Sequence, residues 1–174
     1  MRGFTLLDLL VVIALVGLFL NFGVPGLRTL QGNLATTVEQ YRLLSLLRTA
    51  RSAATLGHQR TVVCPVGVEH AEPACGEAAG AGWLVFADGN GDRRYSPGDD
   101  ELLRVERIPK ARSLHVRERG GEPFDRTLIF RPDGSVLTPA TVELCAASSP
   151  RTARIVISMT GRVRTERAPL PCAA

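Results

Sequence analysis

Residues 4–20 form an apolar run that contains one charged side chain, that of Asp8. Apolar character then continues as far as Leu27. A helix needs about 20 apolar residues, rising about 1.5 Å each, to cross the hydrocarbon core of a bilayer. The run therefore predicts a membrane-spanning helix over residues 4–27. An ionised carboxylate inside such a helix is costly, so we expect Asp8 to have a function and a partner.

The single charge before the run, Arg2, predicts how the helix is oriented. Positive charge favours the cytoplasmic side, so everything after about residue 28 is expected to be exported. A cleaved secretory signal is the alternative interpretation. Only three residues precede the run and no small-x-small cleavage site follows it cleanly, which disfavours that alternative. With 174 residues, the chain has room for one globular domain beyond the span.

An amphipathic pattern follows the apolar run. Apolar residues recur every three or four positions at Leu30, Leu34, Val38, Tyr41, Leu44 and Leu47. This spacing predicts that the helix continues over residues 28–57 with those side chains on its buried face. Pro25 is expected to bend or interrupt the helix, because it lacks a backbone donor and clashes with the preceding turn. Gly57 is the predicted end of the helix.

Short β-type runs separated by turn residues occupy the rest of the chain. Runs of strand length and composition cover residues 61–66, 82–87, 101–106, 113–117, 127–131, 135–137, 141–145 and 153–159. A tight turn is expected over residues 131–135, where proline and glycine stand together. The predicted fold class is therefore α+β, with a long N-terminal helix packed on a mostly antiparallel β domain over residues 58–174.

The segment GFTLLDLLVVIALVGLFLNFGVPGL resembles the class III signal of type IV pilins and of type II secretion pseudopilins. The resemblance implies that residues 1–3 are a leader, which a prepilin peptidase removes between Gly3 and Phe4. Phe4 would then be the N-methylated terminus. Asp8 would hold the acidic fifth position and Pro25 the helix-bending position. The family position usually holds Glu, and Asp8 is one methylene shorter.

In this family the acidic side chain is thought to pair with the N-terminal amine of a neighbouring subunit, which neutralises both charges inside a bundle of apolar helices. The alternative is that Asp8 only extends to the lipid headgroups near the helix end. The resemblance implies three partners: other pilins or pseudopilins through the helix, the prepilin peptidase and the inner membrane. It also implies a single-pass inner-membrane protein with a periplasmic domain, later found in a pilus or pseudopilus near its tip.

The second half of the chain resembles the GspH/FimT branch of pilin-like proteins. Four segments carry the resemblance: RTARSAATLGHQRTVVC, GWLVFADGNGDRRYSPGDDELLR, IFRPDGSV and RIVISMTGRVR. It implies a type IV pilin-like fold and the function of a minor pilin or a pseudopilin.

Four cysteines, Cys64, Cys75, Cys145 and Cys172, follow the apolar run and are expected in an oxidising space. Three pairings are open. We favour Cys64 with Cys75, which closes a short loop, and Cys145 with Cys172, which would tie the C-terminal tail to a strand. A zinc site is the alternative, but CxxC spacing is missing and His70 stands alone.

The acidic segment over residues 88–101 begins like a calcium loop, because Asp88, Asn90 and Asp92 alternate. Arg93 then replaces the usual glycine and Asp99 the usual glutamate, so the segment is expected to be a polar loop between strands. The sequence has no nucleophile elbow, P-loop or dinucleotide fingerprint. We therefore predict no metal, no cofactor and no enzymatic activity.

Arginine supplies almost all of the positive charge, since Lys110 is the one lysine and the formal net charge is +4. A basic cluster lies near the C-terminus at Arg151, Arg154, Arg162, Arg164 and Arg167. In a strand, Arg162 and Arg164 would share a face about 6.6 Å apart, which is close to a nucleotide step. The two guanidiniums are then able to contact successive phosphates of DNA.

The Gly161–Arg164 segment also resembles a Gly-Arg-x-Arg element of the GspH/FimT branch. That element is associated with FimT-type minor pilins that bind DNA during natural transformation. The resemblance therefore implies a minor type IV pilin that helps to initiate the pilus and binds DNA for uptake. The alternative is a type II secretion pseudopilin with a structural role, in which the arginines only protect a solvated edge strand from aggregation.

Overall fold

The computed structural model describes most of the chain. The described residues are 6–66, 73–76, 82–108, 114–146 and 151–167, without the side chains of residues 21–23, 25 and 167. The predicted cleavage site at Gly3 and Phe4 lies outside the described residues, as does Cys172.

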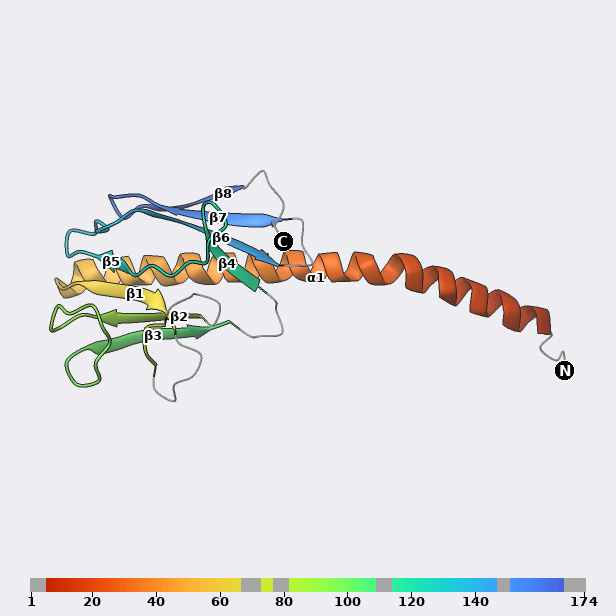
Figure 1. Cartoon of the computed structure of the whole chain (residues 1–174), viewed down its shortest axis with the longest axis horizontal. Coiled ribbons are helices and arrows are strands. Elements are labelled where there is room, and N and C mark those ends of the chain that lie inside the picture. Colours follow the sequence, from red (N-terminus) through yellow and green to blue (C-terminus); the bar gives the residue numbers. More distant parts are fainter. Residues whose placement is uncertain (1–5, 67–72, 77–81, 109–113, 147–150, 168–174) are drawn as a thin grey trace.

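One long helix precedes eight strands (Figure 1). The elements are α1 (Leu6–Gly57), β1 (Thr61–Pro65), β2 (Gly82–Ala87), β3 (Glu101–Arg107), β4 (Leu114–Glu118), β5 (Leu128–Phe130), β6 (Ala140–Ala146), β7 (Thr152–Ile157) and β8 (Val163–Arg167). The strands form two sheets, β3-β2-β1-β5 and β4-β6-β7-β8, in which all neighbours are antiparallel. The predicted α+β class is confirmed.

Helix α1 is continuous for 52 residues and is not interrupted at position 25. Its axis bends within the N-terminal half, which extends away from the sheets (Figure 1). The apolar side chains between Leu6 and Leu20 are exposed in this half, and Asp8 is exposed in the first turn. Among the described residues, no helix has the length and apolarity needed to cross a membrane.

The predicted end of α1 at Gly57 is confirmed. The residue that follows, His58, has a φ of 52°, in the left-handed region that often terminates a helix. The chain then enters β1 three residues later.

The face of α1 that packs on the sheets differs from the predicted one. Leu44 and Leu47 are buried as expected, but Leu30, Leu34, Val38 and Tyr41 are 40–66% exposed. The buried side of the helix consists instead of Gly32, Thr36, Glu39, Leu43, Leu44, Leu46, Leu47, Ala50 and Ala54. Of these residues, Leu43, Leu46, Leu47, Ala50 and Ala54 belong to the core that the helix shares with both sheets. The larger apolar residues form a separate exposed stripe.

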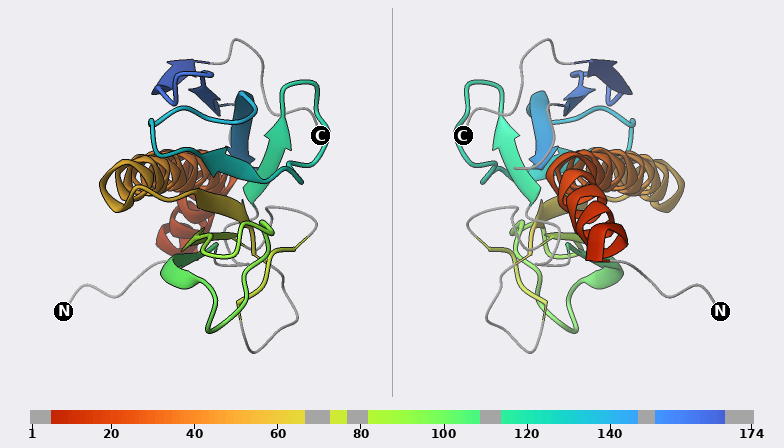
Figure 2. Two further views of the ribbon diagram at one scale, coloured as in Figure 1. Left: turned by 90° about the vertical axis from the view of Figure 1, so that its left-hand side faces the viewer. Right: turned by 90° about the vertical axis from the view of Figure 1, so that its right-hand side faces the viewer.

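The main core lies between the C-terminal half of α1 and both sheets (Figure 2). Helix residues Leu46 and Leu47 contribute to it, together with Phe130 of β5 and Ile155 of β7, all of them fully buried. In Figure 2, which looks along the helix, most of the first sheet lies below α1 and the second sheet above it. The helix therefore lies between the two sheets, and its packing against both of them fixes how the sheets are placed relative to each other.

A smaller core covers the other face of the first sheet. Val62, Cys64, Leu84 and Phe86 are fully buried there, and the ring of Tyr95 lies 5.5 Å from that of Phe86 between ring centroids. Tyr95 comes from the loop between β2 and β3, so this loop acts as a lid on the sheet.

The predicted strand over residues 135–137 is not formed. The chain turns instead, with Gly134 donating to the Arg131 carbonyl and Arg131 to the Ser135 carbonyl, both at 2.8 Å. Val136 makes one isolated bridge with Phe130, and its N–H donates to the Met159 carbonyl. The N–H of Leu137 donates instead to the Ile129 carbonyl. Residues 135–137 thus divide their hydrogen bonds between two segments and do not form a regular strand with either.

Candidate nucleic-acid interface

Arg162 and Arg164 lie at the edge of the second sheet. Arg164 belongs to β8, whereas Arg162 precedes this strand and is part of the turn that follows β7. In that turn, Gly161 donates to the Ser158 carbonyl at 2.8 Å and Ser158 donates to the Arg162 carbonyl at 3.1 Å. Both arginines are exposed. Of the two residues that were expected on one strand, only Arg164 is there.

The turn that carries Arg162 requires glycine at position 161. Gly161 has a φ of +71°, and a Cβ atom there would lie 1.9 Å from the Gly134 carbonyl oxygen. Any larger residue would therefore separate the two turns as well as strain the backbone. This close contact stacks the turn at residues 158–162 on the turn at residues 131–135.

A helix side chain, Arg51, joins both turns to α1. Its Nε donates to the Gly134 carbonyl at 3.0 Å and its Nη2 to the Thr160 carbonyl at 3.1 Å. The guanidinium thus satisfies two backbone acceptors at once. The role of Arg51 was not predicted from the sequence, because nothing in the local pattern distinguishes it from the other arginines of the helix.

Two of the predicted arginines have carboxylate partners. Arg154 lies 2.7 Å from Glu143, and both side chains are less than 20% exposed. The Nε of Arg164 lies 3.0 Å from Glu166, in a pair that is much more exposed. The partly buried pair is a fixed part of the sheet, since breaking it leaves a poorly solvated charge. The exposed pair contributes little to stability, and another anion can easily replace its carboxylate.

These pairs belong to a row of alternating charge across the second sheet. Glu143 is directly opposite Arg117 of β4 on one side and Arg154 of β7 on the other, and Arg154 is opposite Glu166 of β8. Opposite charges in register stabilise neighbouring strands. This row explains why only part of the basic cluster is left for a ligand.

The other two arginines of the cluster lie toward the far end of the same strands. Arg151 is exposed just before β7. Arg167 is opposite Ala153 at the end of β8, and its side chain is outside the described residues. Arg151 and the backbone of Arg167 thus lie at the opposite end of β7 and β8 from Arg162 and Arg164.

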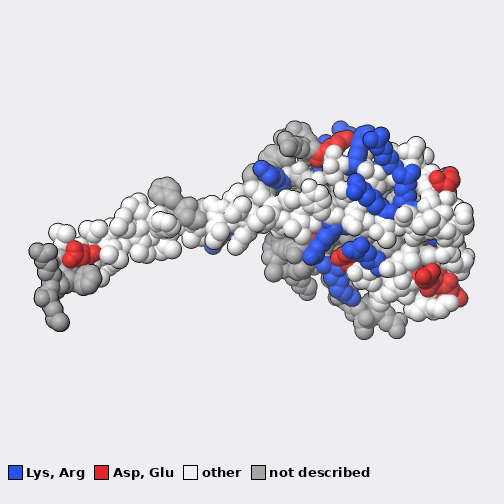
Figure 3. All heavy atoms as spheres, turned by 180° about the vertical axis from the view of Figure 1, so that it is seen from behind, with Lys and Arg blue, Asp and Glu red and all other residues white. Residues whose placement is uncertain are grey.

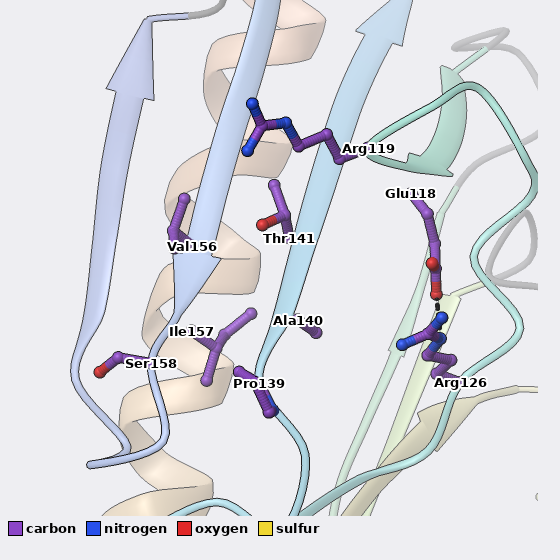
Figure 4. Close-up of a pocket in the computed structure, with 9 residues that line it drawn as sticks. All are labelled: Glu118, Arg119, Arg126, Pro139, Ala140, Thr141, Val156, Ile157 and Ser158. Atoms are coloured by element: carbon purple, nitrogen blue, oxygen red, sulfur yellow. Dashed lines mark ion pairs between the residues drawn. The ribbon is translucent and has the colours of Figure 1, made fainter.

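A depression of about 320 Å³ opens on the outer face of this sheet (Figure 4). It is lined by Glu118, Arg119, Arg126, Pro139, Ala140, Thr141, Val156, Ile157 and Ser158. Arg126 is paired with Glu118 at 2.5 Å, on the side toward β4. Arg119 comes from the loop after β4. It was not predicted as a site residue because it belongs to no sequence motif.

Charge is unevenly distributed along the molecule (Figure 3). The arginine side chains seen from this side gather on the globular part, whereas the extended part of the helix is almost uncharged apart from an acidic group near its end. The candidate interface is therefore confined to the β domain.

The turn below Gly161 contains one carboxyl with a shifted pKa. Ser135 donates both its hydroxyl, at 2.6 Å, and its backbone N–H, at 2.8 Å, to Asp133 Oδ1. These hydrogen bonds lower the pKa of Asp133 below its ordinary value of 3.8, because they stabilise the ionised form.

The disulfide between Cys64 and Cys75 is present, with 5.5 Å between the two Cα atoms. It ties the segment at residues 73–76 to β1. Cys145 is disulfide-bonded as well, and Cys172, its predicted partner, is outside the described residues.

The loop after β2 uses its carboxylates internally. Asp88 accepts from the N–H of Gly91, and Asp100 accepts from those of Gly89 and Ser96. In the described part of the chain, no group of three His, Cys, Asp or Glu residues is arranged to hold a metal ion. The hydrogen bonds fit the predicted polar connection.

The sequence matches known proteins over most of its length. The family model of type II transport protein GspH matches residues 40–161. The pilin-like protein PilA1 of Thermus thermophilus is 32% identical over 181 residues, which cover 95% of this chain and 98% of that protein.

Two solved structures share the fold. The type IV minor pilin FimU of Pseudomonas aeruginosa aligns with a TM-score of 0.55 and 18% identity, over 79% of this chain and 95% of that one. The minor pseudopilin EpsH of Vibrio cholerae aligns with a TM-score of 0.54 and 15% identity, over 76% and 96% of the two chains. Pilins and pseudopilins are structural proteins, and membership implies association with a pilus or pseudopilus. This chain belongs to the GspH/FimT family of minor pilins and pseudopilins.

Proposed function

We propose that this protein is a minor type IV pilin that helps to initiate the pilus and binds DNA for uptake in natural transformation. The observation that carries the DNA-binding part is the state of Arg162. Its side chain is exposed, it forms no ion pair with any described residue, and its backbone is fixed by the Gly161 turn and Arg51. A guanidinium held in this way loses little backbone freedom when it binds an anion.

Arg164 supplies the second contact of the proposed site. Its side chain is 60% exposed and that of Glu166 is 40% exposed, so water screens their attraction. A phosphate is able to replace the carboxylate at low cost, because guanidinium binds both groups in the same bidentate geometry. Contacts to phosphates carry no base information, so we expect binding to DNA of any sequence.

The experiment is a salt titration of DNA binding by fluorescence anisotropy, with the full chain in a nonionic detergent. Replacing Arg162 and Arg164 together by Gln should weaken binding and flatten its salt dependence, because each phosphate contact releases counterions. Circular dichroism should show an unchanged fold, since both side chains are on the surface. Equal affinities and equal salt slopes would reject the site.

For assembly, we propose that prepilin peptidase cuts between Gly3 and Phe4 and that the helix holds the subunit in the inner membrane, with residues 58–174 in the periplasm. Asp8 would then pair with the N-terminal amine of a neighbouring subunit in the filament. The exposed apolar side chains of the N-terminal half of α1 support packing among other helices. Mass spectrometry of the mature protein tests the cut, and a mature start beyond residue 20 would contradict it.

Asp8→Asn tests the proposed pairing, because it keeps the size of the side chain and removes its charge. The variant should insert in the membrane as before but be incorporated poorly into filaments. Normal incorporation, measured in sheared filament fractions, would show that Asp8 extends only to the headgroups.

A structural pseudopilin of type II secretion is the second candidate. The match to the GspH family model and the shared fold with EpsH favour it. This candidate needs the same helix but no DNA contact, so the salt titration also separates the two functions.

A further inference from the structure

Arg119 is a third exposed arginine on the outer face of the second sheet. Its side chain leaves the loop after β4 and extends across β6, so that the guanidinium lies above Thr141 and toward Val156 of β7 (Figure 4). It forms no ion pair with any residue that the structure describes.

The strand register brings Arg119 to the same part of the sheet as the two predicted arginines. Val156 is directly opposite Thr141 of β6 and directly opposite Arg164 of β8. Neighbouring strands are about 4.8 Å apart, so Arg119 and Arg164 approach β7 from opposite sides within about two strand spacings. Arg162 flanks the same region, because Ser158 donates its hydroxyl to the Arg162 carbonyl at 3.2 Å.

The floor between these arginines is neutral. Thr141, Val156 and Ser158 belong to the lining of the depression, and the one carboxylate among its described lining residues, on Glu118, is already paired with Arg126. The lining residues that the structure describes include no aromatic side chain, so they offer no platform on which a base could stack. Cationic walls and a small, neutral floor instead suit a sugar–phosphate backbone.

We propose that this depression holds one strand of DNA by its backbone, with Arg119 contacting a phosphate on the side opposite to Arg162 and Arg164. The proposal rests on the proposed DNA binding and adds the location and direction of the strand, which would cross β6, β7 and β8 rather than follow the edge of β8. Arg119 then contributes about as much to DNA binding as Arg164 does.

The test compares Arg119→Gln with the double Gln variant of Arg162 and Arg164 in the anisotropy titration of the full chain in nonionic detergent. A labelled single-stranded 20-mer of mixed sequence is the probe. Arg119→Gln should weaken binding about five- to tenfold at low salt and lower the salt slope by about 0.7, which corresponds to one single-strand phosphate contact. Arg119→Lys should restore most of the affinity. The matched control is Arg94→Gln, an exposed arginine in the loop that covers the first sheet.

A second variant tests the floor without removing any arginine. Thr141→Glu places a carboxylate on the floor and should weaken binding at least as much as Arg119→Gln. Ser52→Glu changes the net charge equally on an exposed part of the helix and should have little effect.

The outcomes separate this proposal from the proposed function. Loss of binding in the double variant, with none in Arg119→Gln or Thr141→Glu, would overturn the strand path and leave the DNA site at β8 intact. Unchanged binding in all variants would overturn both. An equal loss in Arg94→Gln would also overturn both, because it would show that DNA responds only to total charge.

Discussion

The two sheets pack on the same helix but differ in what lies on their outer faces. The first sheet is covered by a second apolar layer around Phe86, with Tyr95 and the Cys64–Cys75 disulfide above it. The second sheet has no such cover among the described residues, and its outer face carries Arg154, Glu143 and the depression beside Arg119. The first sheet is therefore buried in apolar side chains on both faces, whereas the described outer face of the second sheet is largely polar.

The comparison also shows how an open sheet is kept in shape. On the first sheet, apolar side chains fix both faces. On the second, three polar devices fix the described residues: the charge row through Glu143 and Arg154, the glycine contact at Gly161, and the Arg51 hydrogen bonds. Each of these uses polar or backbone groups, which leaves the surface hydrophilic.

The largest effect is expected from a substitution in the apolar layer that covers the first sheet. Phe86→Ala should lower the free energy of unfolding by about 3–5 kcal/mol, because it removes a fully buried ring and leaves a cavity. Val156→Ala, on the outer face of the second sheet, should cost about 1 kcal/mol or less. Urea unfolding followed by the fluorescence of buried Trp83 measures both. Similar losses of unfolding free energy in the two variants would mean that the two outer faces contribute equally to stability.

The next effect concerns the turn that shapes the open sheet. Gly161→Ala should cost about 3 kcal/mol, since strain at a φ of +71° adds to the clash with Gly134. The matched control is Gly91→Ala, where φ is +80° but nothing lies within 4 Å of the new Cβ, so that only strain of about 1–2 kcal/mol applies. Equal unfolding midpoints for the two variants would show that the Gly134 contact is not tight.

A smaller effect should appear in ligand binding rather than in stability. Glu166→Gln removes the carboxylate beside Arg164 and should raise DNA affinity about two- to fivefold at low salt, with little change in unfolding. Glu101→Gln, an exposed acid on the first sheet, is the control and should not change the affinity. Anisotropy measures both variants. An unchanged affinity for Glu166→Gln would show that the pair does not compete with phosphate.

The smallest effect is a pH dependence from Asp133. Its pKa is lowered in the folded state, so its contribution is present above pH 3.8 and is lost as the pH falls through the lower folded value. Stability should thus rise with pH in this acidic window, and Asp133→Asn should make that rise shallower. Thermal unfolding between about pH 2 and 5 tests this, and identical slopes for the two proteins would contradict it.

The sequence predicted the elements better than it predicted their contacts. The helix end at Gly57 and most strands followed from local patterns, because turn residues and β-branched runs act within a few positions. The buried face of α1 did not, since the helix has two apolar sides and the sheets, which are distant in sequence, pack on the one with Leu46 and Ala50.

The same limit applies to the candidate site. Arg162 and Arg164 were found because they form a short motif. The ion pair of Arg154 depends on its register with Glu143, eleven residues away, and Arg119 reaches the site from another loop. Neither relation is visible in the sequence before the strands are aligned.

The hydrogen bonds of Arg51 also have a consequence for the order of folding. They join α1 to acceptors that are 83 and 109 residues further along the chain, so the first bond needs the chain as far as Gly134 and the second as far as Thr160. Closing loops of this length costs entropy before any contact repays it, and such contacts slow folding. The helix can exist early, whereas the turn that presents Arg162 is completed late. A chain that ends before Thr160 retains the helix and much of the first sheet but never acquires the surface on which a ligand would be held.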